Sequence, residues 1–133
     1  MCVGRMMSFI MPNNPYFSLV FVNYQSAFEL AAALKTLFSF ERDRALFEVI
    51  VVNNDRTQEH VLRALSVSAG FQLQSLPENS GFGTAANIGA ALARGTVVGF
   101  INPDTLWTRP ILSRVAEQFE SNEEKLLLGI PLT

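Results

Sequence analysis

One carboxylate near the end of an apolar run is the residue best suited to bind a metal ion. The segment INPDT, residues 101–105, closes that run, and Pro103 keeps Asn102 out of helical geometry and fixes a turn. Asp104 then projects beside Asn102. One carboxylate and one amide make a poor closed cage, but they suit Mg²⁺ or Mn²⁺, which substrate phosphates often help to coordinate. The alternative is an Asx-turn, in which the Asp104 side chain bonds its own backbone.

A glycine-rich segment precedes this run. Residues 81–86, GFGTAA, match the loose pattern G-x-G-x-x-[GA] of dinucleotide binding. The match is weak, because that fingerprint belongs directly after the first strand and here follows the third. Gly81 and Gly83 could instead supply unusual backbone angles before a helix, or let the backbone approach another phosphate ligand closely.

Two more polar segments follow apolar runs. Asn23 and Tyr24 come after the first run, and the Tyr24 ring could stack on or bond a ligand ring. Residues 53–55 come after the second run, where they could read a base or cap the helix that follows. Trp107 is either a packing anchor or part of a sugar-facing wall.

Apolar periodicity predicts alternating strands and helices. Buried strands are predicted at 17–23, 47–53 and 96–102, a more exposed strand at 71–76 and a last strand at 125–132. Helices are predicted at 25–40, 57–70, 83–95 and 109–124. Ser26 and Glu29 have the spacing of a capping box, and Gly70 and Gly95 are expected to end two helices. The pattern predicts an α/β fold with a mainly parallel open sheet and helices on both faces. Ligands of such sheets usually bind outside the carboxyl ends of the strands, where all these polar segments fall.

Length and composition fit one globular domain, with 133 residues, 49% of them hydrophobic, and a net charge of −2. We expect a loosely ordered leader at residues 1–16 and a domain at 17–133. Scattered basic residues argue against a nucleic-acid surface. No apolar run approaches the roughly 20 residues of a membrane span, and the N-terminus lacks the features of a signal peptide. We therefore expect a cytoplasmic protein, peripheral at most to the inner face of the membrane.

Four segments together resemble the nucleotide-binding half of family 2 glycosyltransferases with the GT-A fold. They are FSLVFVNYQSAFELAAALKTL, FEVIVVNND, NSGFGTAANIGAALARG and VVGFINPDT, and the resemblance runs over about residues 17–108. Their joint order and spacing are far more specific than any one of them. The Asn-Pro-Asp form of the last motif is similar to that of bacterial rhamnosyltransferase-like members acting on lipopolysaccharide or other surface polysaccharides.

The resemblance implies a role for each matching residue. The residues implied to bind the nucleotide-sugar are Asn23, Tyr24, Asn53, Asn79, Gly81, Gly83, Asn87 and Asn102. Asn53 stands where the family usually has an aspartate that accepts a hydrogen bond from the pyrimidine ring. Asp104 matches the metal carboxylate of the Asp-x-Asp-type motif, and its Mg²⁺ or Mn²⁺ would neutralise the departing diphosphate.

Two departures from the family pattern matter. The neutral Asn53 is a weaker acceptor than a carboxylate, although a shift of register would let Asp55 serve instead. The family's catalytic base, a carboxylate of a later motif, has no match up to Thr133.

The resemblance implies an inverting glycosyltransferase domain that takes a UDP- or dTDP-linked sugar and a polysaccharide or glycolipid acceptor. The alternative is a non-catalytic nucleotide-sugar-binding module or a degenerate remnant. A phosphoacceptor receiver domain is disfavoured, because residues 22–26 carry no acidic cluster. Because an open sheet edge is a liability, we also expect self-association, or a partner that covers the face, near residues 126–132.

Overall fold

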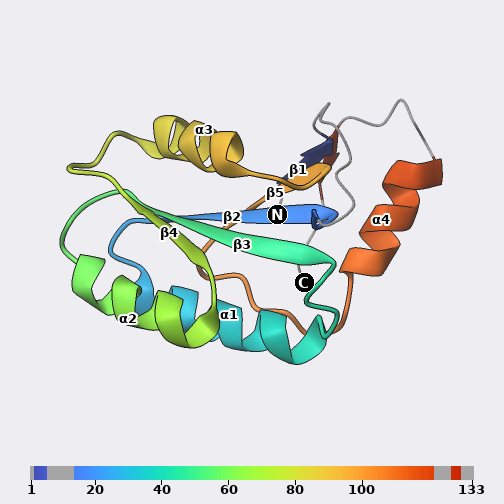
Figure 1. The fold of residues 1–133 in the computed structure, drawn as a ribbon, viewed down its shortest axis with the longest axis horizontal. Helices are drawn as coiled ribbons and strands as arrows, with labels where there is room; N and C mark the ends of the chain where they lie inside the picture. Colours follow the sequence, from blue (N-terminus) through green and yellow to red (C-terminus); the bar gives the residue numbers. More distant parts are fainter. Residues whose placement is uncertain (1, 6–13, 122–126, 130–133) are drawn as a thin grey trace.

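The computed structural model describes residues 2–5, 14–121 and 127–129 (Figure 1). The strands are β1 (Cys2–Arg5), β2 (Phe17–Asn23), β3 (Phe47–Asn53), β4 (Gln72–Ser75), β5 (Val97–Ile101) and β6 (Leu127–Gly129). The helices are α1 (Ala27–Phe40), α2 (Glu59–Ala69), α3 (Phe82–Leu92) and α4 (Leu112–Ser121).

The strands form one sheet in the order β4-β3-β2-β5-β1-β6. β4, β3, β2 and β5 are parallel, whereas β1 pairs antiparallel with both β5 and β6. In Figure 1, α1 and α2 lie on one side of the sheet and α3 on the other. The α/β fold with a mainly parallel open sheet and helices on both faces is therefore confirmed.

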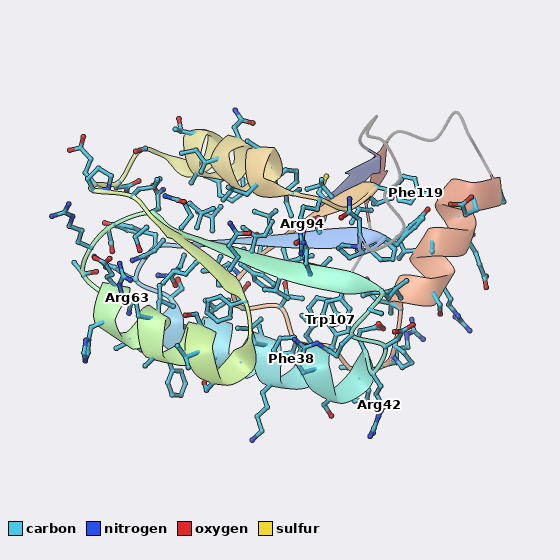
Figure 2. The ribbon with its side chains drawn as sticks, viewed as in Figure 1. Phe38, Arg42, Arg63, Arg94, Trp107 and Phe119 are labelled. Carbon is cyan, nitrogen blue, oxygen red and sulfur yellow. The ribbon has the colours of Figure 1, made fainter. Side chains whose placement is uncertain are left out.

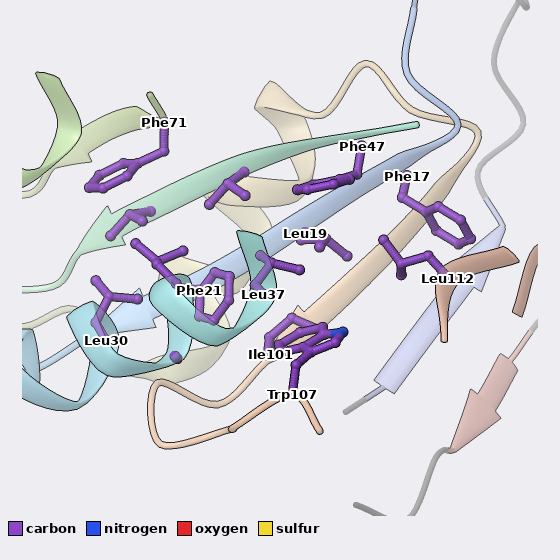
Figure 3. Close-up of a cluster of buried hydrophobic side chains, with 14 of the residues drawn as sticks. Phe17, Leu19, Phe21, Leu30, Leu37, Phe47, Phe71, Ile101, Trp107 and Leu112 are labelled. Atoms are coloured by element: carbon purple, nitrogen blue, oxygen red, sulfur yellow. The ribbon is translucent and has the colours of Figure 1, made fainter. Parts of the chain in front are cut away.

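Alternate side chains of the central strands enter two separate cores. Phe17, Leu19 and Phe21 of β2 pack toward α1, α2 and α4 (Figure 3). Val20 and Val22 of the same strand pack toward α3. A strand buried on both faces must be apolar at nearly every position, which explains the unbroken apolar run that identified it.

Trp107 is a packing anchor. It is 3% exposed and belongs to the core on the α1 side of the sheet (Figures 2 and 3). Its backbone N–H donates to Thr36 Oγ1 at 2.9 Å, which ties the segment after β5 to α1. The sugar-facing alternative does not fit this burial.

The structure differs from the sequence prediction at the N-terminus. Cys2–Arg5 forms β1 and buries Val3 against β5, so the expected loose leader is wrong for these residues. Four residues are too few to show a period, and the pairing with β5 is long-range. The rest of the predicted leader lies partly outside the described residues, which resume at Asn14.

Helix ends also differ. α3 ends at Leu92 and not at Gly95, and α4 begins at Leu112, after Pro110. The buried Glu41 carboxylate accepts the N–H groups of Ile111 (2.7 Å) and Leu112 (3.2 Å), which fixes the start of α4. Of the predicted strand 125–132, residues 125–126 and 130–132 lie outside the described part of the chain.

Candidate functional site

The polar segments predicted to act together lie at one edge of the sheet. Asn23 is in register with Asn53, and Asn53 with Ser75, so the parallel strands end side by side. We call the segments that follow β2, β3, β4 and β5 the carboxyl rim; it lies at the left of Figure 1. The candidate site is built from this rim.

The strand order reverses direction at one point of the rim. β3 and β4 extend the sheet to one side of β2, and the chain then returns to place β5 on the other side of β2. Ligands of open α/β sheets bind in the crevice at such a switch point. Tyr24 follows β2 and Asp104 follows β5, so these two residues flank it.

Asp104 lies in a tight turn with its carboxylate exposed. Thr105 N–H donates to Asn102 O at 3.0 Å, which closes a β-turn with Pro103 at its second position, where proline is favoured. Asn102 and Asp104 are both exposed. Among the described residues the Asp104 side chain has no hydrogen-bond or ion-pair partner, so the Asx-turn alternative does not describe this structure.

A metal ion at Asp104 would need further oxygen ligands. Within residues 2–5, 14–121 and 127–129, no group of three or more His, Cys, Asp or Glu side chains could hold a metal ion. A carboxylate with an amide beside it still fits Mg²⁺ or Mn²⁺, since these ions take oxygen ligands from substrate and water.

A buried network of amides lies beneath the rim. Asn23 Nδ2 donates to Asn53 Oδ1 (3.1 Å) and to Gln58 Oε1 (3.1 Å). Ser26 N–H donates to Asn23 Oδ1 (3.2 Å), and Ala27 N–H donates to Gln58 Oε1 (3.0 Å). Asn23 and Gln58 therefore satisfy the first N–H groups at the start of α1, which otherwise have no intrahelical partner.

The predicted capping box at this helix is wrong. Ser26 makes no side-chain cap, and its Oγ donates to Tyr24 O at 2.8 Å. Ser26 and Glu29 have the spacing of a local capping box. The helix is instead capped by Asn23 and by Gln58, the residue just before α2.

Asn53 belongs to this buried network. It is 0% exposed, and its Oδ1 already accepts a hydrogen bond from Asn23. Because Asn23 Oδ1 accepts from Ser26 N–H, the Asn23 amide must turn its NH₂ toward Asn53. The Asn53 side chain therefore lies under the rim surface, where its Nδ2 has no partner among the described residues.

Asp55 carries an unused acceptor at the rim. Its Oδ1 accepts from Thr57 N–H (3.0 Å) and Thr57 Oγ1 (2.9 Å), while its Oδ2 is buried without a described partner. The residue is 8% exposed. A buried polar atom without a partner needs an explanation. A hydrogen bond donated by a bound ligand to Asp55 Oδ2 would be one.

The rim surface beside these polar groups is partly apolar. Tyr24 is 48% exposed, and Phe82, the first residue of α3, is also exposed. Asn79, Gly83 and Asn87 are exposed as well. A Cβ added to Gly83 would meet no atom within 4 Å, so packing within the described residues does not require glycine there.

Two residues of the rim escaped the sequence analysis. Asn54 was weighed as a base-reading group or a helix cap, yet its side chain bonds Asn79 and Ser80, just before the glycine-rich segment. Gln58 was not singled out. The only available signal was an unbroken polar run after a buried strand, which does not reveal distant partners.

A polar hollow of about 630 Å³ adjoins the rim between α2 and β4. Its lining includes Arg56, Glu59, Arg63 and Ser75 but neither Tyr24 nor Asp104. Arg63, labelled in Figure 2, donates a hydrogen bond that holds the pKa of the half-buried Glu59 carboxyl below its usual range. Because neither Tyr24 nor Asp104 lines it, this hollow is distinct from the switch point.

The fold places the chain among α/β proteins with an open, mainly parallel sheet, and the match to a protein family defines its class further. Residues 18–132 match the model of glycosyl transferase family 2. The chain belongs to this family, as the sequence motifs implied.

A curated relative and two solved structures agree with the family. An uncharacterized glycosyltransferase of Nostoc sp. (strain PCC 7120) is 28% identical over 109 residues, which cover 80% of this chain and 33% of the relative. S. aureus TarS 1–349 in complex with UDP-GlcNAc superposes with a TM-score of 0.70 at 24% identity, over 80% of this chain and 32% of that one. The mannosyltransferase PcManGT of Pyrobaculum calidifontis, in complex with GDP-Man and Mn²⁺, gives a TM-score of 0.63 at 22% identity, over 84% and 34% of the two chains.

These likenesses establish the fold, and the chain spans about a third of the length of these relatives. No helix in the described ranges is both long and apolar enough to cross a membrane.

Proposed function

We propose that this chain binds a UDP- or dTDP-linked sugar together with Mg²⁺ or Mn²⁺, as the donor-binding part of an inverting glycosyltransferase. The observation that carries the proposal is Asp104, an exposed carboxylate in a β-turn beside the switch point of a family 2 chain. Since no described residue bonds this side chain, both carboxylate oxygens are available to a cation.

The metal would sit between Asp104 and the diphosphate. Asn102 precedes Asp104 in the same turn and offers a second oxygen. When bound, the ion supplies positive charge to the leaving diphosphate, which lowers the barrier to breaking the sugar–phosphate bond. The Mn²⁺ in the complex of the mannosyltransferase neighbour supports this choice of ion.

The base would bind at Tyr24 and Asp55. An exposed Tyr24 ring at the end of β2 can cover the face of a base. Asp55 Oδ2 has no described partner and can accept the ring N–H of uracil or thymine. We assign this acceptor role to Asp55 and not to Asn53, because the neutral Asn53 side chain is fully buried and its oxygen already accepts from Asn23.

The glycine-rich segment would lie along the diphosphate and the sugar. Gly83 has open space where a side chain would stand, which suits a close approach by a ligand. Asn87 lies one turn further along the exposed side of α3 and can bond sugar hydroxyls. Asn79 contributes less directly, since its Oδ1 accepts from Asn54 and from Gly81 N–H.

The acceptor is proposed from the Asn-Pro-Asp form of the metal motif at residues 102–104. Its similarity to rhamnosyltransferase-like members favours a surface polysaccharide or glycolipid. With such an acceptor, we place the protein in the cytoplasm, as a peripheral component at the inner face of the membrane.

Calorimetric titration with UDP and dTDP, with and without Mn²⁺, tests the proposal. We expect nucleotide binding that strengthens with Mn²⁺ in the wild type and loses this metal dependence in Asp104→Ala. Glu117→Ala is the matched control, because Glu117 is an exposed carboxylate on α4. Identical metal-independent titrations of wild type and Asp104→Ala would refute the role of Asp104.

A second measurement separates enzyme from binding module. No described carboxylate matches the family's catalytic base, which must take the proton of the acceptor hydroxyl during inversion. If the chain binds the nucleotide-sugar and Mn²⁺ but neither hydrolyses nor transfers the sugar, the non-catalytic alternative holds for the chain alone.

A further inference from the structure

Asn54 joins the end of β3 to the segment that leads into α3. Its side chain is closed off from solvent, with the residue 2% exposed. Asn54 Nδ2 donates to Asn79 Oδ1 (3.0 Å) and to Gly81 O (3.2 Å), and Asn54 Oδ1 accepts from Ser80 N–H (3.0 Å). Both ends of one amide are thus committed to residues 79–81, which lie 25 to 27 positions later in the chain.

The orientation of this amide is unambiguous. Ser80 N–H needs an acceptor, whereas Gly81 O needs a donor, so the Asn54 oxygen and NH₂ cannot be exchanged. The backbone of Asn54 is anchored as well, because its N–H donates to Asn23 O at 2.8 Å. Asn54 therefore connects the ends of β2 and β3 to the glycine-rich segment.

The segment that Asn54 holds has a demanding conformation. Gly81 has φ 84° and ψ 158°, a region that residues with a side chain rarely enter. Asn79 Oδ1 also accepts Gly81 N–H at 2.9 Å, so Asn79 is fixed by Asn54 and in turn fixes Gly81. α3 begins at the next residue, Phe82. The hydrogen bonds of Asn54 and Asn79 therefore orient the first turn of α3 relative to the rim.

We infer that Asn54 is a positioning residue of the donor site. It holds residues 79–81 so that Gly83 and Asn87 face the bound donor, and it does not touch the donor, because its amide is buried and fully bonded. This inference rests on the proposed function for the identity of the donor, but the ordering of residues 79–81 by Asn54 stands on the contacts alone.

Asn54→Ala tests the inference with two readouts. Hydrogen exchange followed by NMR should show faster exchange at the Ser80 and Gly81 amides, with the β2 and β3 amides still protected. The affinity for UDP with Mn²⁺ should fall on the order of tenfold or more, the usual effect of removing a residue that orients a binding group.

Ser18→Ala is the matched control. Ser18 is also fully buried and bonded, since its Oγ donates to Glu48 (2.6 Å) and accepts Gly95 N–H (2.8 Å), but it lies near the opposite, amino end of β2. At a temperature where both variants are folded by circular dichroism, Ser18→Ala should retain wild-type affinity. An equal loss of affinity in both variants would show a general effect of stability and overturn the inference.

Asn79→Ala keeps the inference testable if Asn54→Ala does not fold, because Asn79 is exposed. It removes one partner of Asn54 and one of Gly81, and it should raise the exchange rate of Gly81. If both single variants fold, their effects on UDP affinity should be non-additive in the double variant, as for residues of one network.

The outcomes separate this inference from the proposed function. Unchanged exchange at Ser80 and Gly81 in the variants overturns it, and so does faster exchange with unchanged UDP affinity. If the wild type binds no nucleotide, the proposed function fails, and the exchange rates alone decide whether Asn54 orders residues 79–81.

Discussion

Gln58 is a half-buried residue of the carboxyl rim, in the segment after β3, and it helps to hold the turn that carries Tyr24. Its Oε1 accepts from Asn23 Nδ2 and from Ala27 N–H, on either side of the turn that carries Tyr24. Gln25 in that turn has φ 52°, a left-handed conformation that is uncommon for a residue with a side chain. The surrounding hydrogen bonds keep the turn in place, so the turn at Tyr24 depends on two amide side chains, the buried Asn23 and the half-buried Gln58.

Replacing Gln58 should destabilise the fold if the new side chain has no oxygen to accept these two hydrogen bonds. Gln58→Leu leaves Asn23 Nδ2 short of one partner and Ala27 N–H without its acceptor, and we expect a loss of about 1–3 kcal/mol in the free energy of unfolding. Gln58→Glu keeps an acceptor oxygen at the same place and should stay closer to wild type. Urea denaturation measures both, and equal stability of the two variants would contradict the role of the Gln58 oxygen.

At this scale the sequence indicates only part of the site. Asp104 and Tyr24 could be named as candidates because each lies just after an apolar run. The amide network was not, because Asn23 bonds partners 30 and 35 residues away and no local pattern records such pairs. For the same reason the sequence could not show that Asn53 is buried, or that Asp55 Oδ2 has no partner in the described part of the chain.

At the scale of elements, α3 must pack on the sheet and also face the rim. Gly89 serves the packing, because a Cβ there would collide with Val20 and approach Val52 at 3.2 Å. Gly83 stands near the start of the same helix with open space around it. Packing on the sheet requires glycine at Gly89 but not at Gly83, although the sequence shows only a helix of small residues.

This contrast predicts opposite effects for two identical substitutions. Gly83→Ala should leave stability unchanged or raise it by up to about 1 kcal/mol, since alanine is the better helix former, while UDP affinity falls. Gly89→Ala should destabilise the protein by about 1–3 kcal/mol, through overpacking against Val20. Thermal denaturation and UDP titration measure both effects. A Gly83→Ala variant that binds UDP as well as wild type would argue against close approach of the donor at this residue.

The ends of elements were predicted best where burial is complete. β2 and β3 have the predicted bounds, because strands buried on both faces are continuous apolar runs. β1 was missed, since it is short and owes its place to pairing with β5. The start of α4 depends on Glu41, which lies 70 residues before Ile111 in the chain.

At the scale of the molecule, the order of strands creates the site. β5 returns to the side of β2 opposite β3, and this brings Asp104 to the rim beside Tyr24. Alternation of strands and helices predicted the parallel sheet and its rim. It could not predict the antiparallel β1 between β5 and β6, because strand order depends on long-range pairing.

β6 is an edge strand of the described sheet, at the opposite edge from β4, and we predict self-association through it. β6 pairs with β1 and has no second neighbour in the described sheet, so its outer edge offers unpaired backbone groups. Sedimentation velocity over a range of protein concentrations should show a dimer or larger species. A single monomeric species at every concentration would rule this prediction out.

The central claim is that Asp104 and a bound diphosphate hold one cation at the switch point. The most direct measurement is the NMR line broadening that Mn²⁺ causes at backbone amides, recorded with and without UDP. With UDP present, we predict that small amounts of Mn²⁺ broaden the amides of residues 104–106 and of the turn at Tyr24 most strongly, and that Asp104→Ala abolishes this effect. Broadening centred elsewhere on the protein, or unchanged in Asp104→Ala, would contradict the account.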